Sequence, residues 1–296
     1  MAECVITAFT GDNPSTILAL PLRPLDAIIS LGTSTTLLMA TPTYAPSPSY
    51  HLFNHPTDKG LYMFMLCYCN GALAREKIRD KIIPTSTPLS SGDPWKEFNE
   101  KALSTPRLGK PSKSDDAKLG IYFPIPEIVP NARAGTWRYC ISPAGNLKKV
   151  ESFDSGADAR AIVESQALSM RLRTNPLLST STPAQPRRVY LVGGASKNPA
   201  ITKILGQVLG GKEGVYRLDV GGNACALGAA YYAAWAVEGR KKNGGEEGFE
   251  DFVAGRWEEG GRIVKVGEGY EEGVWEEYGD VLDAFEEIER RIGRGE

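Results

Sequence analysis

The chain has 296 residues, with 34 basic and 36 acidic side chains that give a formal net charge of −2 at pH 7. A chain of this length can bury one large hydrophobic core or two small ones. Its nearly balanced charge argues against a dominant electrostatic surface, so we expect neither nucleic acid nor a membrane as its main partner.

The cysteines and the N-terminus indicate a reducing compartment. The five cysteines are odd in number and irregularly spaced, unlike a disulfide framework. The opening residues Met-Ala-Glu-Cys lack the basic and apolar regions of a signal peptide. The longest apolar run, residues 224–237, is too short to span a bilayer. We therefore expect a soluble, cytoplasmic protein.

The chain opens with a pattern of strand, turn and helix. Residues 4–9 are β-branched or apolar and predict a buried strand. Gly11 permits a sharp turn, Asn13 can cap a helix, and Pro14 suits the first helical position. Asp12 would then lie at the carboxyl end of a strand, where open α/β sheets bind ligands. The alternative is an aspartate that only caps the helix or shapes the turn.

A hairpin is predicted next. Residues 26–30 predict a second buried strand, and residues 36–40 its returning partner. The intervening Gly32-Thr33-Ser34 turn offers backbone N–H groups and hydroxyls that point one way, which suits a phosphate. The same three residues also occur in ordinary turns, so the motif alone does not decide between the two.

The middle of the chain is predicted to be partly irregular. A strand at 61–68 precedes helices at 71–82 and 95–103. We expect residues 104–150 to form an irregular insertion over the edge of the ligand cleft, with one strand at 120–125.

A second strand–turn–helix unit follows a long helix predicted at 157–173. Residues 188–192 predict a strand that ends in Gly193-Gly194, and Asn198 with Pro199 starts a helix. Two glycines leave room for a flat ring or a ribose against the backbone, and the helix N-terminus favours anions. Gly-Gly is also a common turn on spacing alone.

The C-terminal part contains a strand at 215–220 and an alanine-rich helix that ends near residue 237. Residues 239–273 are rich in Gly and Glu and predict a loosely structured loop. Residues 274–292 predict an amphipathic docking helix. We therefore divide the chain into a domain at 1–238, the loop, and a docking segment at 274–296. The predicted docking side chains are Val281, Leu282, Phe285 and Ile288.

A zinc site is a weaker alternative. Cys67 and Cys69 follow His51 and His55, but the spacing is not that of a zinc knuckle. We expect structural cysteines and no metal ligands among these four residues.

Together the motifs resemble a known family. Thr10-Gly11-Asp12-Asn13-Pro14, followed by Ser30-Leu31-Gly32-Thr33-Ser34, is similar to the opening of the second lobe of the FGGY carbohydrate kinases, and most closely of the xylulokinases. The Gly193-Gly194 unit resembles the family's adenosine motif. The resemblance implies an α/β fold, an actin-like ATPase (ribonuclease H-like) lobe with a mixed sheet flanked by helices.

The resemblance also implies roles for individual residues. Asp12 would be the general base that takes the sugar's proton, and Asn13 would help to hold the sugar. ATP, carried with Mg²⁺, would be bound by one set of residues: Gly32, Thr33, Trp95, Gly193, Gly194 and Asn198.

Two positions keep an alternative role, and two depart from the family pattern. Without the resemblance, Trp95 would be expected to pack into the hydrophobic core from its helix. Glu164 resembles a family glutamate near the nucleotide, and its alternative is a solvated or salt-bridged helix residue. Thr35 stands where the family often has an acidic residue, and Lys197 where it often has histidine.

The implied reaction is ATP-dependent phosphorylation of a sugar, D-xylulose to D-xylulose 5-phosphate. The resemblance begins at the family's second lobe, so we expect a C-terminal lobe with the N-terminal lobe absent, inactive in isolation. Two alternatives stay open: a non-catalytic actin-like nucleotide-binding or scaffold protein, and a sibling kinase for glycerol, gluconate or ribulose.

Overall fold

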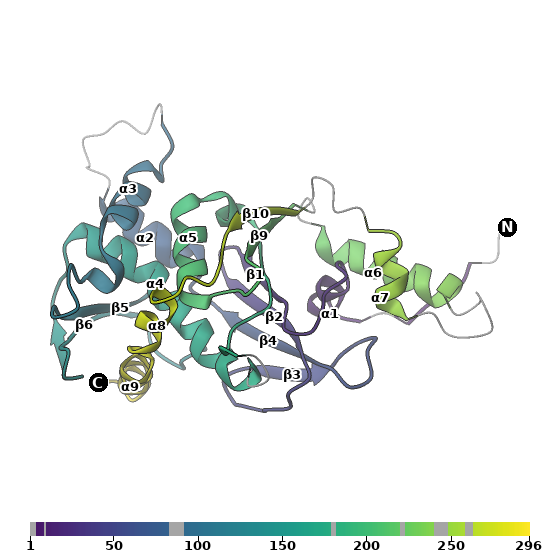
Figure 1. Ribbon diagram of the computed structural model, residues 1–296, viewed down its shortest axis with the longest axis horizontal. Coiled ribbons are helices and arrows are strands. Elements are labelled where there is room, and N and C mark those ends of the chain that lie inside the picture. The colour runs from purple at the N-terminus through teal and green to yellow at the C-terminus, as the bar shows by residue number, and fades with distance from the viewer. Residues whose placement is uncertain are drawn as a thin grey trace.

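The computed structural model describes residues 4–8, 10–82, 92–178, 182–219, 223–239, 248–257 and 263–296. These residues form a larger and a smaller sheet, with helices on both faces of the larger one (Figure 1). The larger sheet has the strand order β10-β9-β8-β1-β2-β4-β3, and the smaller sheet the order β5-β6-β7. The predicted mixed sheet flanked by helices is confirmed.

The strands of the larger sheet are β1 (Ala27–Leu31), β2 (Thr35–Thr41), β3 (His51–Asn54), β4 (Tyr62–Tyr68), β8 (Val189–Val192), β9 (Val215–Leu218) and β10 (Ile263–Gly267). Those of the smaller sheet are β5 (Ala117–Phe123), β6 (Gly135–Ile141) and β7 (Leu147–Val150). Strand β1 runs parallel to β8, and β8 runs parallel to β9. The other pairs are antiparallel, including the predicted β1–β2 hairpin.

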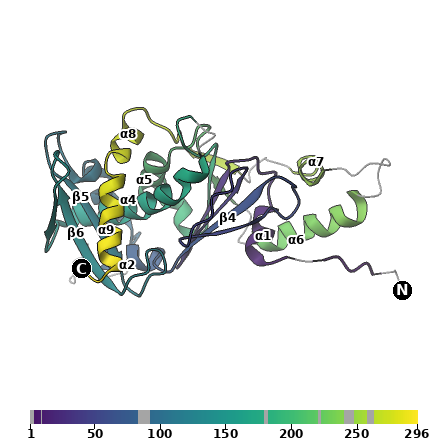
Figure 2. The ribbon, with the colours of Figure 1, turned by 90° about the horizontal axis from the view of Figure 1, so that it is seen from below.

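The helices fall on two sides of the larger sheet (Figures 1 and 2). On one side lie α1 (Asp12–Ile17), α6 (Ala224–Ala234) and α7 (Phe249–Ala254). On the other side, with the smaller sheet, lie α2 (Ala72–Ile82), α3 (Lys96–Ser104), α4 (Ser155–Thr174), α5 (Pro199–Leu209), α8 (Val274–Gly279) and α9 (Leu282–Gly293). Within the described part of the chain, no helix combines the length and the apolar character that crossing a bilayer requires.

Strand alternation divides the core between these two sides. Ile29 and Leu31 of β1 face the side of α4 and α5, whereas Ile28 faces α1 and α7. Since successive side chains of a strand point to opposite faces, each strand contributes to both cores. The sheet is therefore covered on both faces, which explains the near-continuous apolar runs in the sequence.

Helix α4 is the central helix, and its predicted position at 157–173 is confirmed. It is buried over most of its surface because α2, α3, α5 and the smaller sheet all pack against it. Asp154 starts it, since its carboxylate accepts the N–H of Ala157 at 2.9 Å. Alanines and serines along the helix allow these neighbours to approach closely.

The prediction of a strand at residues 4–9 is wrong for residues 4–8, and Phe9 lies outside the described residues. Residues 4–8 pair with no described strand, and Ile6 is 93% exposed. A β-branched run forms a strand only where a neighbouring edge accepts its hydrogen bonds. The helix cap is also corrected: α1 begins at Asp12 with Gly11, not Asn13, as its N-cap. Pro14 still fits, because the first turn of a helix needs no N–H donors.

Two predicted irregular regions contain regular structure. Residues 104–150 hold β5, β6 and β7 instead of a single strand at 120–125. The exposed β7 and half-exposed β6 carry polar side chains, so their alternation is weak in sequence. Residues 239–273 contain α7 and the edge strand β10, while 240–247 and 258–262 lie outside the described residues.

The predicted C-terminal helix is two helices, α8 and α9, separated near Asp280. Its four predicted docking side chains are nevertheless buried, so the predicted docking surface is confirmed: Val281, Leu282, Phe285 and Ile288.

Helices α1 and α6 cross at very close range. A Cβ atom at Gly228 of α6 would lie 1.7 Å from the carbonyl oxygen of Ser15 in α1. Only a residue without a side chain permits this crossing, which sets the position of α1 over the sheet.

We predict that Gly228→Ala separates α1 from α6. The added methyl overlaps a backbone atom that cannot rotate away, so the free energy of unfolding should fall by about 1–3 kcal/mol in urea denaturation. Gly92→Ala is the control, because a Cβ there meets nothing within 4 Å. Equal stability of the two variants would contradict the close crossing.

Candidate functional site

Two glycine turns meet at one edge of the larger sheet. Parallel strands β1 and β8 are neighbours, with Ser30 opposite Val192, so both chains leave the sheet at the same edge. Strand β1 continues into Gly32 and β8 into Gly193. Gly193 has a φ of +90°, and a Cβ there would lie 2.9 Å from the carbonyl oxygen of Leu31. The second turn therefore touches the end of the first strand, which only glycine allows.

The first turn presents its N–H groups on one side. Its carbonyl oxygens on Gly32 and Thr33 accept the N–H groups of Ala72 at 2.9 Å and Gly71 at 3.0 Å. In a trans peptide the N–H points opposite to the C=O, so the N–H groups of Thr33 and Ser34 point away from α2. Among the described residues, neither N–H group donates a hydrogen bond. Two free N–H groups in one turn form the kind of concavity that binds an oxyanion.

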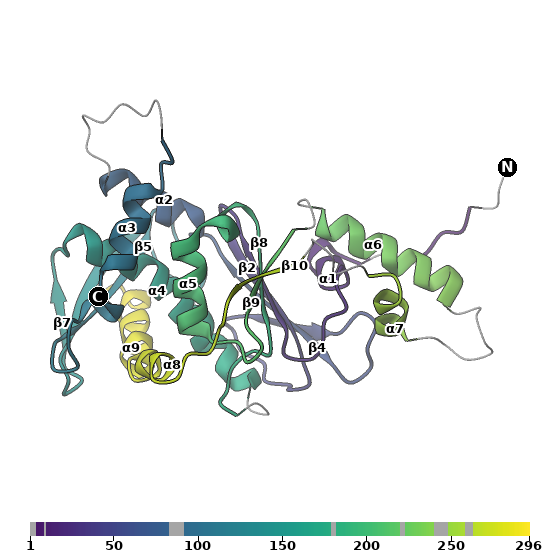
Figure 3. The same cartoon turned by 45° about the horizontal axis from the view of Figure 1, so that its top comes forward.

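A pocket of about 480 Å³ lies beside these turns, between the sheet and helices α1 and α6. Polar groups reach it from several elements (Figure 3 shows α1 and α6 next to β8 and β9). Its polar and glycine lining comprises Asn13, Thr16, Ser30, Thr36, Gly193, Gly194, Ser196, Lys197, Arg217, Asp219 and Cys225. The pocket therefore brings the start of α1 and the Gly193-Gly194 turn into one space.

Asp12 stands next to this pocket. It is the first residue of α1, it is exposed, and it directly precedes Asn13 of the lining. Its Oδ1 accepts the N–H of Asn13 at 2.8 Å, so the carboxylate is held in the first turn of α1. No other donor to this carboxylate occurs among the described residues, so the second oxygen stays open for a ligand.

Of the residues predicted to contact ligands, Asn13, Gly193 and Gly194 line the pocket. Gly32 and Thr33 are not part of this lining. They belong to the adjoining turn, and Ser30 and Thr36, which flank the turn in β1 and β2, do line the pocket.

Asn198 and Trp95 lie outside this lining. Asn198 is the N-cap of α5, where its Oδ1 accepts the N–H groups of Ala200 at 3.0 Å and Ile201 at 3.1 Å. Trp95 packs edge-on against Phe98, and the guanidinium carbon of Arg79 lies 4.7 Å from its ring centroid. Their roles in nucleotide binding stay predictions.

Glu164 is a structural residue. It is 1% exposed and accepts hydrogen bonds from Arg160 at 2.6 Å and from the Tyr278 hydroxyl at 2.6 Å. Burial raises the pKa of the Tyr278 phenol well above its ordinary value, so this hydroxyl keeps its proton and donates it. The salt-bridged alternative for Glu164 is the one observed.

Sequence reasoning missed several lining residues, namely Thr16, Ser30, Thr36 and Cys225. Ser30 carried a usable signal, because it is the one polar residue in the otherwise apolar β1, and the structure exposes it. The others are polar or small side chains at helix and strand ends, where nothing in the local pattern distinguishes them.

Sequence comparison finds relatives over nearly the whole chain. The profile of the C-terminal domain of the FGGY family of carbohydrate kinases matches residues 27–237. A probable D-xylulose kinase A of Aspergillus terreus is 55% identical over 296 residues, which are 98% of this chain and 51% of that protein. A probable D-xylulose kinase A of Aspergillus flavus is 54% identical over 297 residues, with the same two shares. The chain spans about half the length of the curated relatives it matches.

Solved structures show the same fold. The xylulose kinase of Rhodospirillum rubrum has a TM-score of 0.63 at 19% identity, over 93% of this chain and 49% of that one. The xylulose kinase of Bifidobacterium adolescentis has a TM-score of 0.60 at 25% identity, over 92% of this chain and 46% of that one. The likeness confirms the predicted actin-like ATPase lobe.

We predict that two substitutions of Asn198 separate its cap from any ligand contact. Asn198→Ala removes the acceptor of two N–H groups and should lower the free energy of unfolding by about 1 kcal/mol. Asn198→Asp keeps an acceptor and should unfold like the unchanged chain. Urea denaturation measures both, and adenosine titration of Asn198→Asp then tests the predicted contact. If both variants lose the same stability, the cap is not the source of the effect.

Proposed function

The chain belongs to the FGGY family of carbohydrate kinases, and we propose that it supplies the nucleotide-binding half and the catalytic base of an ATP-dependent sugar kinase. The sugar is D-xylulose and the product D-xylulose 5-phosphate, in line with the names of the relatives at 54–55% identity. The observation that carries the proposal is the meeting of two glycine turns beside the start of α1.

The nucleotide lies along the carboxyl edge of the sheet. Adenosine approaches the backbone at Gly193 and Gly194, where no side chain intervenes, and Asn198 and Trp95 are further proposed contacts. The phosphates bind at the Gly32–Thr33 turn, supported by its two free N–H groups. The Lys197 side chain in the adjoining pocket adds positive charge on the phosphate side.

Asp12 activates the sugar hydroxyl. Its carboxylate takes the hydroxyl proton while the hydroxyl oxygen bonds to the γ-phosphorus and the bond from that phosphorus to the bridging oxygen breaks, which releases ADP. The hydrogen bond from the Asn13 N–H holds one carboxylate oxygen and leaves the other for the sugar. Bases of this kind contribute about 10²- to 10⁴-fold to the rate. Asn13 contributes to holding the sugar.

Magnesium fits as a companion of the nucleotide. Among the described residues, no group of three or more histidine, cysteine, aspartate or glutamate side chains is arranged to hold a metal. Mg²⁺ is usually held by substrate phosphates with one or two carboxylates, so a dedicated protein cage is not required. When bound, it neutralises phosphate charge during transfer.

The proposed reaction needs a further half, corresponding to the part of the relatives outside the match. That half supplies most of the sugar pocket and closes over the nucleotide, so this chain alone should bind nucleotide without phosphorylating sugar. A cytoplasmic location belongs to the proposal as well, because all five cysteines carry free thiols.

We predict that Asp12→Asn abolishes turnover without unfolding the lobe. The test fuses the N-terminal half of the Aspergillus terreus relative to this chain and measures ADP release with D-xylulose. The amide cannot accept the proton, so the rate should fall by at least about 100-fold, with ADP affinity and thermal stability unchanged.

Asp283→Asn is the matched control, an exposed carboxylate on α9. Turnover by Asp12→Asn at the rate of this control would contradict the proposed base. A fusion that binds ADP and turns over no sugar would favour the non-catalytic alternative.

A further inference from the structure

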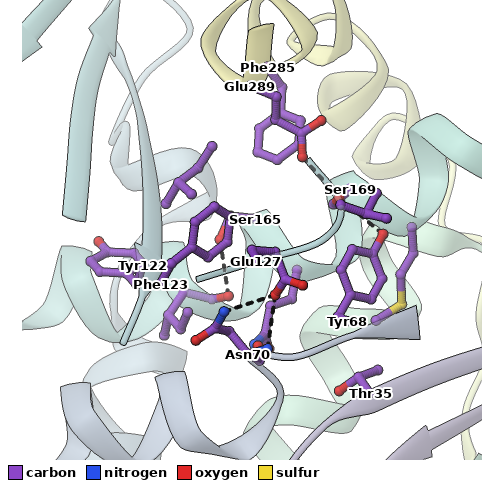
Figure 4. A pocket seen from close by; sticks show the side chains of 15 residues that line it. Thr35, Tyr68, Asn70, Tyr122, Phe123, Glu127, Ser165, Ser169, Phe285 and Glu289 are labelled. Atoms are coloured by element: carbon purple, nitrogen blue, oxygen red, sulfur yellow. Dashed lines mark hydrogen bonds between the residues drawn. The ribbon is translucent and has the colours of Figure 1, made fainter. Parts of the chain in front are cut away.

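We propose that Glu127 is a positioning residue for the Gly32–Ser34 turn, an inference that rests on the proposed role of this turn in binding phosphate. Glu127 lies between β5 and β6, outside the lining of the pocket beside the two glycine turns, and acts through residues 69–71. Figure 4 shows it next to Asn70 in the interior, with dashed lines that mark hydrogen bonds between these two residues.

The Glu127 carboxylate is saturated with N–H donors from that segment. Oε1 accepts the N–H of Cys69 at 2.8 Å, and Oε2 accepts the backbone N–H of Asn70 at 2.9 Å and its Nδ2 at 3.0 Å. Oε1 also accepts the N–H of Ile128 at 2.8 Å. Glu127 is 2% exposed, and no cation pairs with it in the described part of the chain. The buried charge is therefore compensated by these four donors.

Gln166 holds the same segment from helix α4. Its Nε2 donates to the carbonyl oxygens of Asn70 at 2.8 Å and Gly71 at 3.0 Å, and its Oε1 accepts Arg75 at 2.6 Å. Glu127 thus fixes the N–H groups of the segment, and Gln166 fixes its carbonyl groups. Together the two side chains fix the orientation of the peptide groups in residues 69–71.

Gly71 transmits this orientation to the turn. Its N–H donates to the carbonyl oxygen of Thr33 at 3.0 Å, and a Cβ on Gly71 would lie 2.6 Å from the carbonyl carbon of Ser34. The two backbones are therefore in direct contact. If residues 69–71 shifted, the Thr33 carbonyl would lose its donor, and the Thr33–Ser34 peptide could rotate its N–H away from the phosphate.

The peptide orientation matters for anion binding because a rotated peptide would present a carbonyl oxygen, which repels phosphate, in place of an N–H group. Loss of Glu127 should therefore weaken the binding of the phosphate groups of the ligand. It should leave the binding of the adenosine group unchanged, because adenosine is proposed to contact Gly193 and Gly194.

The test compares Glu127→Gln with Glu289→Gln in the full chain. The first variant keeps the shape but turns an NH₂ group toward backbone N–H donors. The second is a matched buried carboxylate, which lines the interior cavity of Figure 4 together with Glu127. It is bonded to Arg173 and Ser169 but not to residues 69–71. Amide hydrogen exchange without ligand, and titrations with ADP and with adenosine, are the readouts.

We expect exchange at Gly71 and Ala72, whose N–H groups bond the carbonyl oxygens of the turn, to rise about tenfold or more in Glu127→Gln and to stay unchanged in Glu289→Gln. ADP affinity should fall about tenfold in Glu127→Gln while adenosine affinity stays unchanged. Gln166→Leu should reproduce the pattern and serves if Glu127→Gln does not fold. Equal exchange in Glu127→Gln and Glu289→Gln, or an equal loss of ADP and adenosine affinity, would overturn the inference.

Failure of the proposed function would look different. If the unchanged chain bound neither ADP nor adenosine, the phosphate role of the turn would fail. The exchange of the Gly71 and Ala72 amides in the ligand-free chain would still show whether Glu127 holds the contact between residues 69–71 and the turn.

Discussion

The contact on which the site depends is that between Gly193 and the end of strand β1. Two parallel neighbours, β1 and β8, leave the sheet at the same level, and the second turn touches the backbone of Leu31. Any side chain at position 193 would separate the turns, and its φ of +90° is also strained for residues with a Cβ. The distance between the two proposed halves of the nucleotide site is therefore set by backbone contact, without adjustable side chains.

The remaining architecture keeps this edge rigid and accessible. On one face, α4 and its neighbours bury the apolar side chains of β1 and β8. On the other, α1 is set by its close crossing with α6 at Gly228, which brings Asp12 and Asn13 next to the Gly193 turn. Behind the first turn, the segment held by Glu127 and Gln166 supports the peptides that we propose to bind phosphate. Backbone contacts on three sides thus define the candidate site.

Much of this could be predicted from sequence where the signal is local. The β1–β2 hairpin, helix α4 and the β8–Gly193–Gly194–α5 unit follow from apolar periodicity, glycine and capping residues. Residues 4–8 and the smaller sheet could not be predicted in the same way. A strand depends on a partner distant in sequence, and β6 and β7 expose one face. Glu127 is the clearest such case, because its donors lie 57 and 58 residues away.

The central claim is that the N–H groups of Thr33 and Ser34 bind the nucleotide phosphates. A crystal structure of the chain with ADP and Mg²⁺ tests it most directly. We expect phosphate oxygens within about 2.7–3.2 Å of both nitrogen atoms, and adenosine against Gly193 and Gly194. Phosphates bound elsewhere, or a turn whose carbonyl groups face the nucleotide, would contradict it.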